Sequence, residues 1–409
     1  MSAFSVIKSH PFQVIKGFNF ILYGTFAIYS SFFPLYLKSF GMSSIGISLL
    51  LAGGPILSLI ANPFWGYWSD RLVNVRRILI ALLIGSLISL QLVFFFNAYS
   101  LIITFLLVFF FFQSPLFSQS NSLILEAIEH TPYKFGSFRL WGALGWALLA
   151  LGTGPVMEWL GIRQLWVVCA LMMGLSILLA FMLPNGSGSR EQAATVQSSN
   201  YLQVIGNKWF MTFIVMGILI SIPNAMNNTF VSIYMSDLGG STGLVGWSAF
   251  FASIFEIPVY LLFDRFLRKE RRSMILCLAA VSLLYALRWF LMAEATSPYH
   301  ILCIQALNSI TFAGYYYVGT QLTAYLIPSA YRASGQAVYA LSWGGLSGII
   351  AGIAGGWIFQ MLGPQAMYRF SSILALLGVA GFTVMFAVAV RREAREEEKT
   401  HNKGEMYYE

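Results

Sequence analysis

Long apolar runs constrain the fold of this chain more than any other feature of its sequence. Stretches of about 20 mostly apolar residues between polar breaks predict twelve membrane-spanning helices. A content of 58% hydrophobic and only 10% charged residues agrees with this, because a soluble core needs less apolar surface. We therefore expect an all-α integral membrane protein whose spans start near Phe18, Ser43, Arg77, Leu101, Phe138, Arg163, Lys208, Gly243, Ser273, Tyr299, Gly335 and Met367.

The middle of the chain separates two similar sets of six spans. Residues 184–206 form the longest polar stretch, rich in Gly, Ser and Gln, which is typical of a flexible linker. Asp70-Arg71 after span 2 recurs as Asp264-Arg265 after span 8. We expect two pseudo-symmetric six-helix bundles, residues 1–183 and 207–390, joined by a cytoplasmic linker at 184–206 and followed by a cytoplasmic tail at 391–409.

The distribution of basic residues predicts the orientation in the membrane. If the N-terminus is cytoplasmic, the inner segments hold 19 of the 24 Lys and Arg residues and the outer loops only Lys38, Arg163 and Arg369. An even number of spans returns the C-terminus to the cytoplasm. We expect a multi-pass plasma-membrane protein of a bacterial type, and the net charge of +8 needs no nucleic-acid partner.

Four charged residues lie within or at the inner ends of apolar runs: Glu126, Arg139, Glu256 and Arg288. A charge near the bilayer midplane costs roughly 2.5 to 3.5 kcal/mol on insertion scales, so each needs a partner or a water-filled cavity. These residues are the first candidates for a functional site. Glu126 has an alternative interpretation as an interfacial acid at the end of span 4.

Arg139, Gly142 and Trp146 are spaced i, i+3, i+7 and share one helical face with a small residue between two large ones. A ligand could approach the backbone at the glycine. A guanidinium suits vicinal hydroxyls or a carboxylate, and an indole accepts the apolar side of a ring. This chemistry fits a sugar and an aromatic acid equally, and simple packing is the alternative for Trp146.

Polar stripes on spans 1 and 7 outline a central cavity. Span 1 carries Asn19, Tyr23, Ser30 and Pro34 on one side, and span 7 carries Ser221, Asn224, Asn228 and Ser232. We take Asn19, Tyr23, Asn224 and Asn228 as candidate substrate contacts. Hydrogen bonding between helices is the alternative for all of them.

Two further patterns in the apolar runs predict packing. Gly344, Gly348, Gly352 and Gly356 recur every four residues and predict a smooth ridge for close helix contact. The cluster from Phe109 to Phe112 is expected to face lipid. No P-loop, zinc-ligand spacing or nucleophile elbow occurs, so we expect no enzyme, no cofactor and no metal site.

The segment GYWSDRLVNVRR resembles the loop signature between spans 2 and 3 of the major facilitator superfamily, through Gly66, Asp70, Arg71, Arg76 and Arg77. A second glycine of that signature is replaced around Val73 and Asn74. The resemblance implies a gating loop, repeated in part by Asp264 and Arg265. A loop that is basic only because it is cytoplasmic is the alternative.

The segment EAIEHTPYKFGSFRLWGALGW resembles spans 4 and 5 of the lactose permease branch and its phenylpropionate-permease-like relatives. The resemblance implies that Glu126 and Arg139 hold sugar hydroxyls and that Trp146 stacks on the sugar ring. It also implies that Glu256 links substrate to a proton, with Arg288 near the proton site. A structural buried ion pair is the alternative for Glu256 and Arg288.

The chain departs from the sugar symporters at spans 7 and 10. The Lys, His and Glu series of span 10 is replaced by Gln305, Asn308 and Thr311, and the acids of span 7 by Asn224 and Asn227. Asn308 then becomes a candidate substrate contact. These substitutions leave the coupling ion open, with Glu256 as the first candidate for a proton carrier.

The sequence as a whole predicts a secondary active transporter that works as a monomer by alternating access around one central site. The expected substrate is a small polar organic molecule, first a sugar or oligosaccharide carried with a proton. An aromatic carboxylate or a nucleoside is the second choice. A multidrug exporter or a solute sensor without transport is less favoured, and the sequence leaves the direction of transport open.

Overall fold

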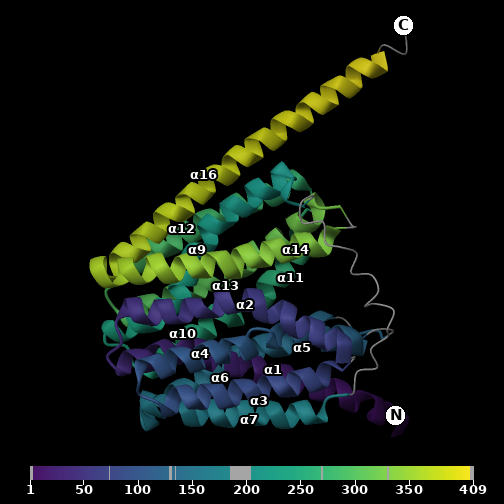
Figure 1. Ribbon diagram of the computed structural model, residues 1–409. Helices are drawn as coiled ribbons and strands as arrows, with labels where there is room; N and C mark the ends of the chain where they lie inside the picture. Colours follow the sequence, from purple (N-terminus) through teal and green to yellow (C-terminus); the bar gives the residue numbers. More distant parts are fainter. Residues whose placement is uncertain are drawn as a thin grey trace.

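The computed structural model describes residues 3–72, 74–128, 131–133, 135–184, 204–268, 270–328 and 331–405. Every regular element in these ranges is helical, and most of the helices lie roughly side by side in one bundle (Figure 1). We call residues 3–184 the first run and residues 204–405 the second run. The two runs lie on either side of the segment that carries the predicted linker.

The first run contains seven α-helices and one short 3-10 turn, η1. Their bounds are α1 Ala3–Ser39, α2 Ser44–Leu72, α3 Val75–Phe95, α4 Tyr99–Gln113, α5 Leu116–Ile128, α6 Phe135–Leu160, η1 Ile162–Gln164 and α7 Leu165–Met182.

The second run includes two π-helical segments, η4 and η5, which have one extra residue in each hydrogen-bonded turn. Its elements are α9 Lys208–Asp237, α10 Thr242–Ile254, α11 Glu256–Phe266, α12 Arg271–Ala293, α13 Pro298–Leu326, α14 Arg332–Ala340, η4 Leu341–Leu346, α15 Ser347–Ile350, η5 Ala351–Gly355 and α16 Gly356–Glu405.

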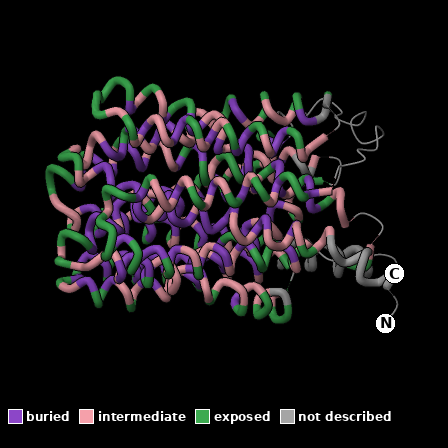
Figure 2. The backbone as a smooth tube through the Cα atoms, turned by 90° about the horizontal axis from the view of Figure 1, so that it is seen from below, coloured by how far each residue is buried: buried purple, intermediate pink, exposed green. Residues whose placement is uncertain are grey.

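Ten segments of the described chain are long and apolar enough to cross a membrane. The last of them, Ser334–Arg392, contains Gly363 with a φ of 87°, where two helices that are continuous by hydrogen bonding meet at a sharp kink. The helix α13 has 29 residues but is not among the ten. Figure 2 shows many buried residues inside the bundle and exposed ones along its outside. Large apolar side chains such as Ile60, Trp159 and Leu178 are among the exposed ones. An apolar exterior around a buried interior suits a lipid environment.

Two of the expected spans are each divided into two helices. Pro115 lies between α4 and α5, and Pro258 lies in the first turn of α11. A proline has no N–H to donate and its ring crowds the carbonyl four residues earlier, which for Pro258 belongs to Ile254, the last residue of α10. The break leaves Glu256 as the first residue of α11.

Glycines allow helix backbones to approach closely at three contacts. A Cβ on Gly145 of α6 would lie 1.9 Å from the carbonyl oxygen of Phe20 in α1, and one on Gly246 of α10 would lie 2.7 Å from the carbonyl oxygen of Ala150 in α6. The predicted glycine ridge of span 11 meets α2: a Cβ on Gly352 would lie 2.5 Å from that of Ala52. The prediction of a close helix contact is confirmed for Gly348, Gly352 and Gly356, whereas a Cβ on Gly344 would meet nothing within 4 Å.

The prediction that the phenylalanine cluster faces lipid is wrong for two of its members. Phe109 is 0% exposed and Phe110 4% exposed. The rings of Phe109 and Tyr29 in α1 lie 5.0 Å apart, and Phe110 packs against Gly53 and Gly54 of α2. These phenylalanines fill the inside of the first run because small residues on α2 leave room for them.

Contacts between the two runs gather at one end of the bundle. Lys38 at the end of α1 pairs with Asp237 at the end of α9. The backbone N–H of Ile45 donates to Oε1 of Gln360 at 3.0 Å, and the Thr242 hydroxyl donates to the carbonyl of Gly154 at 3.1 Å. Lys38 and Asp237 lie at the C-terminal ends of α1 and α9, so the runs are joined at the end of the bundle opposite to the start of α9.

Candidate functional site

The face of α6 that carries Arg139 is covered by Tyr23 of α1. The Arg139 guanidinium lies 4.3 Å from the centroid of the Tyr23 ring, a cation–π contact. A Cβ on Gly142 would lie 3.0 Å from the same ring, so the glycine is needed for this fit. The space that the sequence pattern suggested for a ligand is therefore occupied by Tyr23, which presents Arg139 on an aromatic surface.

Trp146 extends this aromatic surface. Its ring lies 6.0 Å from that of Phe26, and the Phe117 ring lies 4.4 Å from the rings of both Phe26 and Tyr23. The sequence analysis did not single out Phe26 and Phe117. The position of Phe26 three residues after Tyr23 on the same helical face was an available signal, whereas Phe117 on α5 was not predictable from spacing within one helix.

Glu256 from the second run is an anionic counterpart of this surface. Its half-buried carboxyl group interacts electrostatically with Arg139 and with Tyr260, one turn later on α11. Tyr316 of α13 interacts with both Tyr23 and Tyr260. The structure thus places Arg139 and Glu256, from different runs, within electrostatic range of each other without a salt bridge between them. Glu126 lies half-buried in the last turn of α5.

Arg288 has a different environment from the one expected. It is 0% exposed, and its guanidinium donates to Oδ1 of Asn308 at 2.7 Å and to Oε1 of Gln305 at 2.6 Å. It also lies 4.3 Å from the centroid of the Trp289 ring. Neutral amide oxygens and an aromatic face therefore hold this cation, and no described contact joins it to Glu256.

One of the amides that hold Arg288, that of Asn308, also holds the end of the broken helix together with the Ser309 hydroxyl. Asn308 donates through Nδ2 to the carbonyl of Ala252 at 2.9 Å, and the Ser309 hydroxyl donates to the carbonyls of Phe251 and Ala252 at 3.1 Å. These carbonyls belong to the last turn of α10, where the interruption leaves them without helical partners. Asn308, a predicted substrate contact, thus bridges Arg288 and the break that positions Glu256.

Two other predicted polar residues make hydrogen bonds between helices. Asn19 is 1% exposed; it donates to the carbonyl of Ile15 at 2.9 Å and accepts from the Ser120 hydroxyl at 2.9 Å. Asn227 accepts from the Tyr368 hydroxyl at 3.1 Å. The contact of Asn19 with Ser120 matches the alternative interpretation of the span 1 stripe, helix-to-helix bonding, and Asn227, which lies outside the span 7 stripe, makes a bond of the same kind.

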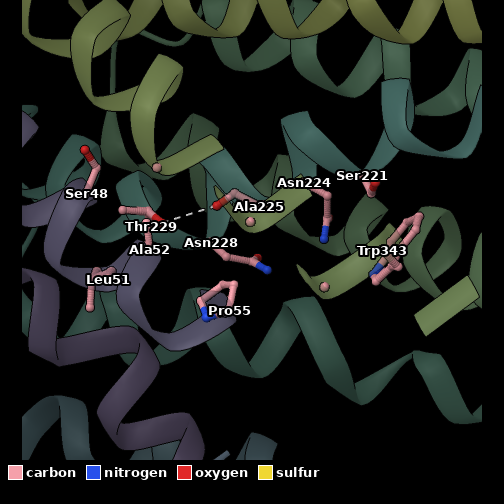
Figure 3. A pocket seen from close by; sticks show the side chains of 13 residues that line it. Ser48, Leu51, Ala52, Pro55, Ser221, Asn224, Ala225, Asn228, Thr229 and Trp343 are labelled. Atoms are coloured by element: carbon pink, nitrogen blue, oxygen red, sulfur yellow. Dashed lines mark hydrogen bonds between the residues drawn. The ribbon is translucent and has the colours of Figure 1, made fainter. Parts of the chain in front are cut away.

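The stripe of span 7 borders a cavity of about 210 Å³. Ser221, Asn224 and Asn228 of α9 line one side, α2 contributes Ser48 and Pro55, and the π-helical region contributes Trp343 and three glycines (Figure 3). Of the two predicted stripes, the one on span 7 therefore faces a cavity between the two runs.

The predicted gating loop joins α2 to α3. Gly66, Asp70 and Arg71 lie in the last turns of α2, Asn74 caps α3 by accepting from the backbone N–H of Arg77 at 3.0 Å, and Arg76 donates to the carbonyl of Phe181 at the end of α7. Asp264 and Arg265 lie in the last turn of α11, where Arg265 contacts the Phe266 ring. No group of three or more metal-ligating side chains occurs in the described ranges.

Known proteins of similar sequence and structure are transporters. Residues 12–370 match the model of the MFS_1 like family. The maltose permease of Geobacillus stearothermophilus is 24% identical over 392 residues, 94% of this chain and 96% of that protein. The probable 3-phenylpropionic acid transporter of Escherichia coli (strain K12) is 25% identical over 374 residues, 88% of this chain and 93% of that protein.

The fold has a close structural counterpart. A crystal structure of a mutant of the nucleoside transporter NupG superposes with a TM-score of 0.81 at 14% identity and covers 91% of this chain and 99% of that one. This likeness concerns the fold alone, which is that of the major facilitator transporters. The match over residues 12–370 spans most of the chain, so the protein belongs to the MFS_1-like family: it is a multi-pass membrane transporter of small molecules and not an enzyme.

Proposed function

We propose that this transporter carries a small neutral sugar or oligosaccharide together with a proton across the bacterial plasma membrane. The observation that supports this most is that Glu256 of the second run lies within electrostatic range of Arg139 of the first. The Arg139 guanidinium packs on Tyr23, whose ring belongs to an aromatic cluster that includes Trp146. A fixed guanidinium binds hydroxyls, and an aromatic surface receives the apolar face of a sugar ring. The maltose permease among the relatives supports the same substrate class.

Glu256 is the proposed proton carrier. A carboxylate is favoured in its ionised form beside a guanidinium and in its protonated form in an apolar environment. If rocking of the two runs changes the distance between Glu256 and Arg139, the carboxyl group binds a proton in one state and releases it in the other. Substrate hydroxyls that occupy Arg139 would make this exchange depend on the substrate.

The proposed architecture has twelve spans in two six-helix halves, residues 1–183 and 207–390, with both termini cytoplasmic. The ten apolar segments become twelve when the last is divided at Gly363 and α13 is counted. The contacts between the runs then lie at the outer side, which corresponds to an inward-facing state. The loops with Arg76 and Arg265 lie at the cytoplasmic side, in agreement with a gating role.

An aromatic carboxylate is the second candidate substrate. Arg139 on its aromatic surface would bind a carboxylate and a phenyl ring as readily as a sugar. The relative named as a probable 3-phenylpropionic acid transporter supports this candidate. The two candidates differ in charge and therefore in the current that transport carries.

The test is substrate-triggered proton movement in reconstituted vesicles with an internal pH-sensitive dye. Glucose, maltose, 3-phenylpropionate and uridine are added in turn to wild-type protein, to Arg139→Gln and to Arg163→Gln. Arg163 is a matched control because its guanidinium also lies over an aromatic ring, that of Phe40 at 5.5 Å, at a helix end outside the site. We expect sugar-dependent proton influx that Arg139→Gln abolishes and Arg163→Gln keeps.

Glu256→Gln tests the coupling step in the same vesicles. The variant should keep exchange of labelled sugar but lose proton-driven accumulation. Undiminished accumulation in Glu256→Gln would exclude Glu256 as the carrier. Proton influx with 3-phenylpropionate alone would replace the sugar by the aromatic acid as substrate.

A further inference from the structure

The cavity beside α9 has a composition that sets it apart from the Arg139 surface. All 13 of its lining residues are uncharged. They come from α2 of the first run and from α9 and the π-helical region of the second (Figure 3). Its volume of about 210 Å³ lies below the roughly 300 to 1,000 Å³ of drug-sized sites, so it suits one small ring or part of a larger ligand.

Asn224 makes the strongest case for a ligand in this cavity. The residue is 5% exposed and lines the cavity, and its Oδ1 atom has no hydrogen-bond partner among the described residues. A buried polar atom without a partner is costly, and such atoms in native structures are usually satisfied by water or a ligand. A bound group that donates a hydrogen bond would remove this cost.

Asn228 adds a second amide one turn later on the same face of α9. It also lines the cavity (Figure 3), and the residue is exposed. Each amide offers both a donor and an acceptor, and side chains at i and i+4 lie about 5 to 6 Å apart at their Cβ atoms. Two such groups match the neighbouring hydroxyls of a polyhydroxylated ring, which also donate and accept.

Trp343 supplies an apolar wall on the π-helical segment η4. Single π-helical turns frequently mark functional sites, and here two of them, η4 and η5, lie at the cavity with four α-helical residues between them. The glycines at 344, 348 and 352 present backbone without side chains along the same wall. A ring bound against Trp343 therefore meets little obstruction.

A row of aromatic rings links the cavity to the Arg139 surface. Trp343 lies 6.2 Å from Phe312, which stacks on Tyr316 at 5.9 Å. Tyr316 in turn lies within electrostatic range of Tyr23, the residue beneath Arg139, without a ring contact between them. The two regions are thus neighbours connected by α13 and η4.

We propose that the cavity between α2, α9 and η4 is a second ligand subsite for a neutral polyhydroxylated ring, with Asn224 and Asn228 as its specificity-determining residues. The inference rests on the proposed sugar transport at Arg139 and extends it. A ligand with one sugar ring would use the Arg139 surface, whereas a ligand with two rings would also reach the cavity. The cavity residues therefore determine affinity for the longer ligand.

The experiment measures equilibrium exchange of labelled glucose and labelled maltose in vesicles, which does not depend on proton coupling. Asn224→Leu removes the amide at similar volume. Asn227→Leu is the matched control, because Asn227 lies on the same helix and is buried but bonds to Tyr368 instead of lining the cavity. Asn228→Leu is a second test variant; Asn228 is exposed, so its substitution should not impair folding.

Loss of one neutral hydrogen bond should raise the half-saturating concentration of maltose about fivefold in Asn224→Leu and in Asn228→Leu. The value for glucose should change less than about twofold. Asn227→Leu should leave the maltose-to-glucose ratio unchanged. An unchanged ratio in both Asn224→Leu and Asn228→Leu would overturn the subsite and leave the proposed function intact.

The other outcomes separate the two proposals. A changed ratio in the cavity variants, combined with full sugar exchange in Arg139→Gln, would support the cavity and refute the role of Arg139. Exchange of neither sugar by the wild-type protein would refute both the sugar assignment and the subsite.

Discussion

Gly145 offers a sharp test of how α1 and α6 hold the site. A Cβ at this position would lie 1.9 Å from the carbonyl oxygen of Phe20 and 2.6 Å from its carbonyl carbon. Ordinary contacts begin at 3.4 Å, so the two backbones would have to separate by about 1.5 Å. Backbone atoms cannot turn away as a flexible side chain can, so the whole contact must open.

The magnitude follows from two opposing terms. Overpacking of a close contact typically costs about 1 to 3 kcal/mol, and a backbone contact belongs at the upper end. Replacement of a helical glycine by alanine stabilises the folded protein by roughly 0.5 to 1 kcal/mol, because the unfolded chain with alanine has less conformational entropy to lose. We expect Gly145→Ala to destabilise the protein by about 2 kcal/mol and to impair transport, because Tyr23 lies one turn from Phe20 on α1.

Gly152→Ala is the matched control on the same helix, since a Cβ there meets nothing within 4 Å. Thermal unfolding of the two variants in detergent, followed by size-exclusion chromatography, gives the stabilities, and vesicle uptake gives the activity. Gly152→Ala should equal or exceed the wild type. A Gly145→Ala variant as stable and active as Gly152→Ala would refute the close α1–α6 contact.

Three shorter predictions concern named contacts. Arg288→Met removes two interhelical hydrogen bonds of roughly 0.6 kcal/mol each, so it should lower the free energy of unfolding by about 1 kcal/mol and impair both exchange and accumulation of substrate. Loss of accumulation with normal exchange and stability would instead favour a direct role of Arg288 in proton coupling. Asp237→Lys places two cations together at the pair with Lys38 and should favour the outward-facing state by about 0.2 to 1 kcal/mol, the range of exposed ion pairs, as measured by cysteine accessibility. Adding Lys38→Asp should restore the original balance of states. If it does not, the ion pair is not part of the gate. In competition binding, Tyr23→Phe should keep sugar affinity within about twofold, whereas Tyr23→Ala should weaken it several-fold because the ring under Arg139 is lost. An equal loss of affinity in both variants would assign the effect to the Tyr23 hydroxyl group.

The class of the protein and much of its inner surface were predictable from residue order alone. Apolar run length predicts membrane helices because a bilayer requires a span of defined length. The glycine spacing predicted the ridge that meets α2, and the period of Ser221, Asn224 and Asn228 placed them on one face. In each case the signal lies within one helix, where the geometry is set locally.

The partners of individual side chains were not predictable in the same way. The sequence suggested for Arg288 a place near the proton site or a buried ion pair with Glu256, whereas its guanidinium donates to the amide oxygens of Gln305 and Asn308. Phe109 was expected to face lipid but is buried. An apolar side chain is equally compatible with a lipid-facing and with a protein-facing position. An arginine can be held by amide oxygens as well as by a carboxylate. Spacing along one helix does not distinguish these environments.

The sequence by itself determined a multi-span membrane transporter, the faces of its polar stripes and the residues able to carry charge. Only the tertiary structure decided that Tyr23 covers Gly142, that Arg139 and Glu256 lie within electrostatic range of each other, and that Asn224 faces a cavity. The physical reason is that helical periodicity defines which residues share a face. The rotation and approach of neighbouring helices, which depend on contacts between distant segments, define what that face meets.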